Sequence, residues 1–93
     1  MIRSFADREA EALFHGQFAR RLTRDIQRVA QCKLRQIHQA TELRDLAAPP
    51  GNRLEALRGD RAGQHSIRIN DQWRICFVWN EGDAERVEIV GYH

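Results

Sequence analysis

QHSIRINDQWRICFVW, residues 64–79, decides the fold, because its apolar and polar side chains alternate on both sides of a short polar interruption. Alternation with a period of two is typical of strands that bury one face. The stretch predicts strands over Gln64–Ile69 and Trp73–Trp79. The three residues between them, 70–72, would close an antiparallel hairpin.

A three-residue loop also fixes the register of this hairpin, since Ile69 must then pair with Trp73. The pairs on one face are Ile69 with Trp73, Ile67 with Ile75 and His65 with Phe77; those on the other are Arg68 with Arg74, Ser66 with Cys76 and Gln64 with Val78. We expect the first face to lie in the core and the second to be open for function. A four-residue loop would abolish this pairing.

Arg68 opposite Arg74 is a like-charge pair, which destabilises a sheet surface unless an anion lies between the two groups. Two sources of that negative charge are open. One is a carboxylate of the protein itself, such as Glu55 or Glu88, and the other is a phosphate of a ligand. His65 falls on the core face, where a packed and hydrogen-bonded histidine is expected.

The segments around the hairpin complete an α+β fold, with two N-terminal helices packed on an antiparallel β-sheet in a single domain, 1–93. Asp7 can cap a helix that begins at Arg8. A period of 3.6 predicts an amphipathic helix from about Arg24 to Ala40, and the Pro-Pro-Gly sequence at 49–51 ends helical structure. The remaining strand candidates are an edge strand over Ile2–Phe5, Arg53–Leu57 and Arg86–Tyr92.

The composition is that of a globular chain: 93 residues, 42% hydrophobic and 30% charged, which argues against disorder and against a disulfide-dense scaffold. Every basic residue except Lys33 is Arg, and residues 80–93 carry one base against four acids. Guanidinium groups bind phosphate through bidentate hydrogen bonds. A polyanionic partner is one explanation of this usage, and a GC-rich coding sequence is the other.

The two cysteines, Cys32 and Cys76, lack the spacing of a zinc site or a redox pair, so we expect both to be reduced and structural. We expect no metal and no cofactor. There is no apolar leader, and no apolar run approaches the length of a membrane span, which predicts a cytoplasmic protein without membrane contact.

Further candidate groups lie outside the hairpin. Arg53, Arg58 and Arg61 would add positive charge if the turn at 59–63 folds toward the arginine pair. The alternative for Arg61 is a loop charge in water. His93 lies beside the terminal carboxylate, which favours the protonated imidazole. It could serve as an acid, or it could fray as a terminal residue.

The run RLEALRGDRAGQHSIRINDQWRICF, residues 53–77, with VEIV at 87–90 and the final Tyr92-His93, closely resembles the HigB toxins, a branch of the RelE/ParE superfamily. The resemblance covers nearly the whole chain. It implies a RelE-like microbial RNase fold and a ribosome-dependent endoribonuclease that cleaves messenger RNA in the ribosomal A site. It also implies a cognate helix-turn-helix antitoxin, HigA-like, which inhibits the toxin and binds the operator DNA of their shared operon.

Roles follow from the resemblance. Arg58, Arg74, Tyr92 and His93 match positions used in HigB active sites, and Arg68 and Asn70 match the strand motif of the family. Arg74 would stabilise the phosphorane. Arg58 and Arg68 would hold flanking phosphates, and His93 would be the acid, oriented by Tyr92. We also assign Arg53 and Arg61 to phosphate binding.

Two positions depart from the family. Gly91 stands where many members have Asp, and Glu55 stands where some branches have His. Glu55 could act as the general base, or it could be an ion-pair partner of Arg53 or Arg74. Two other functions are therefore open: a ParE-like poison of DNA gyrase that cuts no RNA, and a catalytically weak co-repressor subunit of the antitoxin complex.

Overall fold

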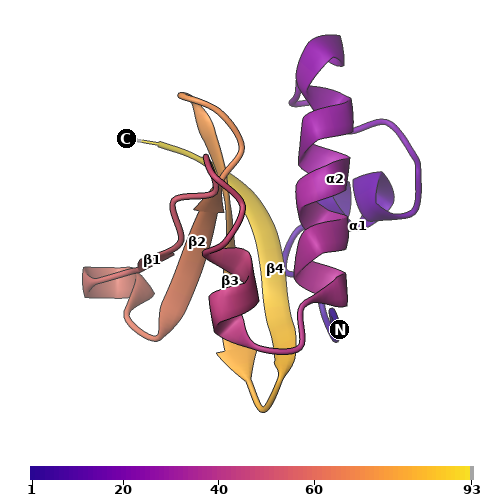
Figure 1. Cartoon of the computed structure of the whole chain (residues 1–93). Coiled ribbons are helices and arrows are strands. Elements are labelled where there is room, and N and C mark those ends of the chain that lie inside the picture. Colours follow the sequence, from indigo (N-terminus) through magenta and orange to yellow (C-terminus); the bar gives the residue numbers. More distant parts are fainter. Residues whose placement is uncertain (93) are drawn as a thin grey trace.

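The computed structural model describes residues 1–92, and these form two helices beside a four-stranded antiparallel sheet (Figure 1). The helices are α1, Arg8–Phe14, and α2, Arg24–Gln39. The strands are β1, Glu55–Ala56; β2, Gln64–Arg68; β3, Trp73–Asn80; and β4, Asp83–Gly91. Two 3₁₀ turns, η1 at Leu43–Leu46 and η2 at Gly59–Arg61, lie in the connections. The α+β prediction is confirmed.

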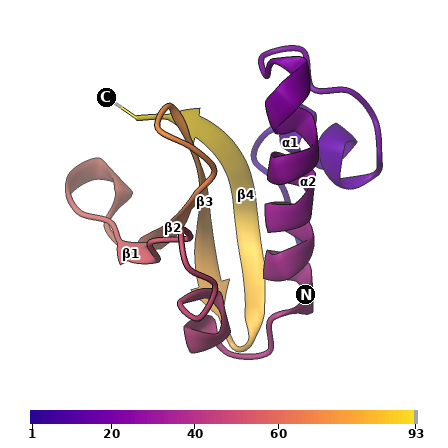
Figure 2. The ribbon, with the colours of Figure 1, turned by 45° about the horizontal axis from the view of Figure 1, so that its top comes forward.

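The helices form because their sequences supply a cap and an apolar stripe. The Asp7 carboxylate accepts a hydrogen bond of 3.0 Å from the Glu9 backbone N–H at the start of α1. In α2 the buried residues Ala30, Leu34 and Ile37 follow each other at helical spacing. Both helices lie on the same side of the sheet, next to β4 (Figure 2).

The sheet is a meander in the order β1-β2-β3-β4. The predicted register of the central hairpin is confirmed at each pair from Gln64↔Val78 to Arg68↔Arg74. A bulge between Cys76 and Val78 shifts the pairing of β3 with β4. This bulge adds local twist to the long outer hairpin.

Several expected boundaries were wrong. The first strand of the meander is only Glu55–Ala56 rather than Arg53–Leu57, and β4 begins at Asp83 rather than Arg86. The left-handed backbone at Arg53, φ 46°, is incompatible with a strand there. The segment 2–5 is not a strand either, since it makes only two isolated parallel bridges to β4, at Ile2 and Phe5.

The core lies between the helices and the sheet, as expected from the alternation. Ile67, Ile75 and Phe77 from the hairpin are fully buried against Leu34 and Ile37 of α2 in one cluster. The opposite face was expected to be open, and this is wrong at its centre. Ser66 and Cys76 on that face are also buried.

Candidate functional site: an arginine-lined pocket at the hairpin tip

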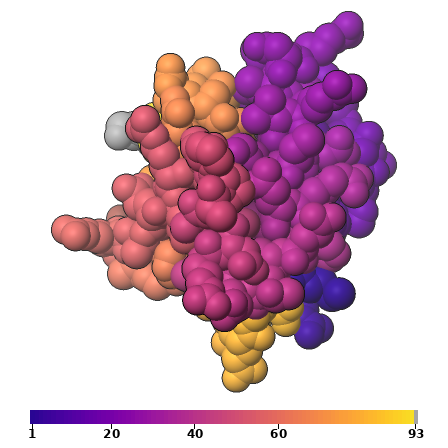
Figure 3. All heavy atoms as spheres, in the orientation of Figure 1, coloured from indigo at the N-terminus to yellow at the C-terminus, as the bar shows by residue number. Residues whose placement is uncertain are grey.

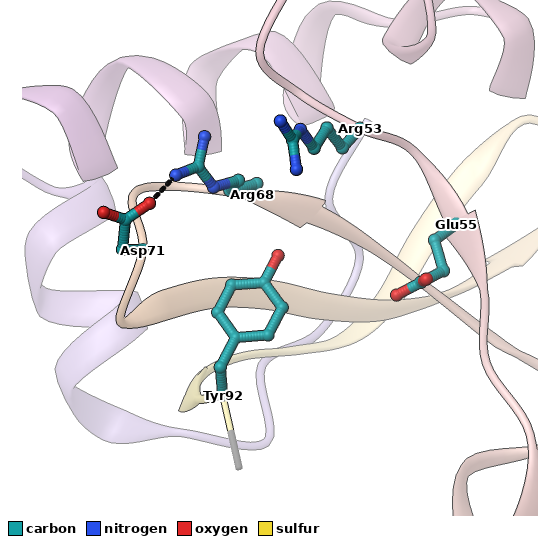
Figure 4. A pocket seen from close by; sticks show the side chains of 5 residues that line it. All are labelled: Arg53, Glu55, Arg68, Asp71 and Tyr92. Carbon is teal, nitrogen blue, oxygen red and sulfur yellow. Dashed lines mark hydrogen bonds and ion pairs between the residues drawn. The ribbon is translucent and has the colours of Figure 1, made fainter.

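A pocket of about 310 Å³ lies beside the β2–β3 loop and is lined by Arg53, Glu55, Arg68, Asp71 and Tyr92. Three parts of the chain meet there: residues 53–55, which lead into β1, the central hairpin, and the residue that follows β4 (Figure 4). In Figure 4 the Tyr92 hydroxyl points toward the Arg53 and Arg68 side chains, while the two carboxylates flank the pocket. In the space-filling view this hairpin loop, in orange, borders the segment that precedes β1 (Figure 3).

Arg68 is held in place by its backbone and is ion-paired through its side chain. Its N–H donates a 2.6 Å hydrogen bond to the Asn52 carbonyl. Its guanidinium forms an ion pair with Asp71, in the loop that closes the hairpin. The Arg68 side chain is 26% exposed and that of Asp71 is 98% exposed. The guanidinium is therefore sheltered, while its partner is surrounded by water.

Arg74 is not among the residues that line the pocket, and its side chain is 20% exposed. Its guanidinium lies 5.2 Å from the centre of the Tyr92 ring and 3.8 Å from the Glu55 carboxylate. Its Nε–H is buried and has no hydrogen-bond partner among residues 1–92. The aromatic face and the distant carboxylate orient this cation but leave its hydrogen-bonding capacity unfilled.

In the free chain, carboxylates of the protein itself neutralise Arg68 and Arg74. Each has its own carboxylate, Asp71 for Arg68 and Glu55 for Arg74. Glu88, the other carboxylate considered, instead pairs with Arg61 at 2.6 Å. Arg61 also donates to the Gln64 side-chain oxygen, so the alternative of a purely solvated loop charge is excluded. The Glu88 hydrogen bond raises the pKa of Arg61.

The remaining predicted site residues are dispersed. Arg58 is exposed and lines a separate open pocket along β1 with Leu54 and Leu57, so the structure does not bring it to the hairpin-tip pocket. The Asn70 side-chain oxygen accepts hydrogen bonds from the N–H groups of Gln72 and Trp73, at 2.9 and 2.8 Å. Asn70 therefore shapes the loop that carries Asp71.

His93 lies outside the described residues, although its neighbour Tyr92 is anchored by an N–H that donates to the Gln72 carbonyl at 2.8 Å. His65 is packed, with its ring stacked near Phe77 at 6.3 Å. The prediction that His65 is hydrogen-bonded is wrong, because its Nδ1 is buried without a partner within residues 1–92. Both cysteines are free, as predicted, but Cys32 is exposed. Burial raises the pKa of the Cys76 thiol.

Two contributors to the site, Lys33 and Asn52, were missed. Lys33 of α2 donates its ammonium hydrogen bond to the Asn52 side-chain oxygen, and Asn52 is fully buried. Burial, and then the nearby Arg68 charge, lower the pKa of Lys33. A clue was available, since Lys33 is the single lysine of the chain. Its distance of 35 positions from Arg68 concealed the link.

The chemistry available is that of anion binding beside a candidate proton acceptor. Two guanidinium groups and a phenol border the pocket, and a carboxylate that is 57% exposed, Glu55, lies at its other side. Within residues 1–92 no cluster of side chains suits a metal ion. In the same range neither helix combines the length and apolar character needed to cross a bilayer.

Comparison with known proteins gives one family model and two relatives that match nearly the whole chain. A family model described as the RelE-like toxin HigB of type II toxin–antitoxin systems matches residues 3–93. The chain is 36% identical over 85 residues to Toxin HigB-1 of Vibrio cholerae, covering 90% of each protein. It is 34% identical over 94 residues to Endoribonuclease HigB of Proteus vulgaris, covering 100% of each.

Proposed function

The chain belongs to the HigB-like family of RelE-like toxins from type II toxin–antitoxin systems, and from this we propose that it is a ribosome-dependent endoribonuclease. Its substrate would be messenger RNA in the ribosomal A site, and its cleavage would stop translation and growth. The observation that carries the proposal is the pocket in which Arg53 and Arg68 converge with Tyr92 above the sheltered Arg74.

The reaction would be attack of a ribose 2′-hydroxyl on the adjacent phosphorus, with departure of the 5′-oxygen. Negative charge then builds on the non-bridging oxygens, and a fixed cation in a sheltered place stabilises it most strongly. Arg74 fits this role because its side chain is 20% exposed and its Nε–H has no hydrogen-bond partner within residues 1–92. The Tyr92 ring holds its guanidinium in position before substrate arrives.

Proton transfer would need a base for the 2′-hydroxyl and an acid for the leaving oxygen. Glu55 is our candidate for the base that accepts the 2′-hydroxyl proton, since its carboxylate lines the pocket and points toward Arg74. His93 is the candidate acid that protonates the leaving oxygen. Gly91 contributes no side chain. Position 91 therefore offers no second carboxylate that could act as a base beside Glu55.

The phosphates that flank the cleaved bond would be held by arginines. Arg68 and Arg53 border the pocket directly. Arg58 and Arg61 lie further along the β1 edge, where they could contact a more distant nucleotide, with Arg61 leaving Glu88 to do so. We also propose that Asn70 contacts RNA, because it lies in the loop between β2 and β3.

A type II toxin implies a cognate antitoxin. We propose a HigA-like antitoxin with a helix-turn-helix domain, which would couple this chain to operator DNA. In the cell it would keep the toxin inactive.

The test is to induce the chain in cells without the antitoxin and to map new 5′ ends of messenger RNA. We expect cleavages in phase with codons. Arg74→Ala should reduce them by about 100-fold or more, the usual cost of losing one donor to a developing charge. The matched control is Arg35→Ala, which removes an exposed arginine from α2.

A wild-type chain that leaves messenger intact would contradict the proposal. Inhibition of gyrase in a supercoiling assay would then select the ParE-like alternative. Normal growth upon induction would select the co-repressor alternative. Thermal unfolding of the Arg74→Ala variant separates lost chemistry from lost folding.

A further inference from the structure

Around Arg68, at one corner of the pocket, positively charged side chains outnumber negatively charged ones. The Lys33 ammonium and the Arg68 backbone both bind Asn52, one at its side-chain oxygen and the other at its carbonyl. Within residues 1–92 neither Lys33 nor Arg53 forms an ion pair with a carboxylate. Three cations therefore share this corner with one carboxylate, Asp71.

That carboxylate is held loosely. Asp71 is 98% exposed and lies in the loop between β2 and β3, and its one ion pair is with Arg68. An exposed pair of this kind contributes little to stability, because water and salt compete for both charges. An RNA phosphodiester offers two non-bridging oxygens and can accept two parallel hydrogen bonds from one guanidinium. Such a group can displace the aspartate at small cost.

We propose that Arg53 and Arg68, backed by Lys33, form a subsite for a phosphate of single-stranded RNA, and that Asp71 occupies it in the free protein as a built-in competitor. The inference rests on the proposed function for its choice of RNA as the anion. It adds to that function a residue that opposes binding. RNA enters by exchanging one negative group for another, which keeps the affinity of the free chain for RNA low.

The exchange has a measurable signature in salt. Each phosphate neutralised on a single strand adds about 0.7 to the slope of log affinity against log salt. In the wild type the phosphate replaces an existing ion pair at Arg68, so the net number of pairs does not change. Asp71→Asn removes the competitor while keeping the size of the side chain. Binding to this variant then creates a new pair.

The experiment is fluorescence anisotropy of a short labelled 2′-O-methyl RNA, which no ribonuclease can cleave by 2′-hydroxyl attack, titrated with the intact chain at several salt concentrations. We expect Asp71→Asn to bind about two- to fivefold more tightly at low salt, the range of an exposed ion pair. Its salt slope should steepen by up to about 0.7. Lys33→Gln keeps a donor for Asn52 and should bind about two- to fivefold more weakly.

The matched control is Glu81→Gln, because Glu81 is an exposed carboxylate at the tip of the other hairpin, between β3 and β4. Figure 1 places the two hairpin tips at opposite ends of the sheet. If Glu81→Gln tightens binding as much as Asp71→Asn, only net charge matters and the subsite is refuted. Unchanged affinity and slope in Asp71→Asn refute it as well, as does the absence of RNA binding by every variant.

The outcome is separable from that of the proposed function. RNA binding that responds to Asp71 without any messenger cleavage in cells would support the subsite and refute the nuclease. Codon-phased cleavage with no effect of Asp71→Asn on RNA binding would do the reverse.

Discussion

At the scale of single residues, the proposed chemistry depends most on the contact between Tyr92 and Arg74. The guanidinium lies 5.2 Å from the ring centre, and its Nε–H has no partner within residues 1–92. A buried donor without a partner costs free energy, and that cost is recovered when an anion accepts from it. Under the proposed function, the ring would hold the Arg74 guanidinium in place for a phosphate of the substrate.

Two substitutions at Tyr92 separate its ring from its hydroxyl. Tyr92→Phe keeps the cation–π contact, so we expect its cleavage rate to fall by less than about tenfold. Tyr92→Ala removes this contact with Arg74, which is worth about 0.5–2 kcal/mol, so we expect its cleavage rate to fall further. The measurement is single-turnover cleavage of messenger on programmed ribosomes. Equal losses in both variants would mean that the hydroxyl, and not the ring, does the work.

At the scale of elements, Asn52 joins three parts of the chain. Its side chain accepts from Lys33 of α2 and donates to Gln36 of the same helix and to the Leu46 carbonyl at the end of η1, both at 3.0 Å. Its carbonyl accepts from Arg68 at the end of β2. A residue that follows the Pro-Pro-Gly turn therefore connects the long helix to the strand that carries the pocket.

Asn52→Ala should destabilise the fold by about 2–4 kcal/mol, since buried partners in two elements lose their hydrogen bonds at once. Urea unfolding followed by circular dichroism gives the free energy. Asn80→Ala, at an exposed position at the end of β3, is the matched control and should change stability by less than about 0.5 kcal/mol. A loss below about 1 kcal/mol in Asn52→Ala would show that water replaces these contacts.

At the scale of the whole molecule, two hydrogen-bonded aspartates make the fold sensitive to acid. A hydrogen bond from Arg3 lowers the pKa of Asp83, and the backbone N–H groups of Glu42 and Thr41 lower that of Asp45. Both pKa values are lower in the folded chain than in the unfolded one. Stability from these groups is therefore complete above the unfolded value of about 3.9 and is lost as the pH falls through the folded values.

We expect the free energy of unfolding to be flat between about pH 5 and 7 with respect to these groups and to fall below about pH 4. Asp83→Asn should lower stability near neutral pH and make the acid limb shallower, because one titrating group is gone. Urea unfolding across this pH range measures both effects. If the free energy of unfolding of Asp83→Asn falls with acid as steeply as that of the wild type, the contact between Arg3 and Asp83 does not stabilise the protein in solution.

The sequence alone determined the hairpin register, the position of the arginine pair, the two helices and the family. These follow from local rules, because strand alternation and a three-residue loop leave one register that buries the apolar face. Only the tertiary structure decided which carboxylate meets which arginine, and only it linked Lys33 through Asn52 to Arg68. Those contacts depend on how α2, β1 and β4 pack against one another. This packing is determined by many residues that are far apart along the chain.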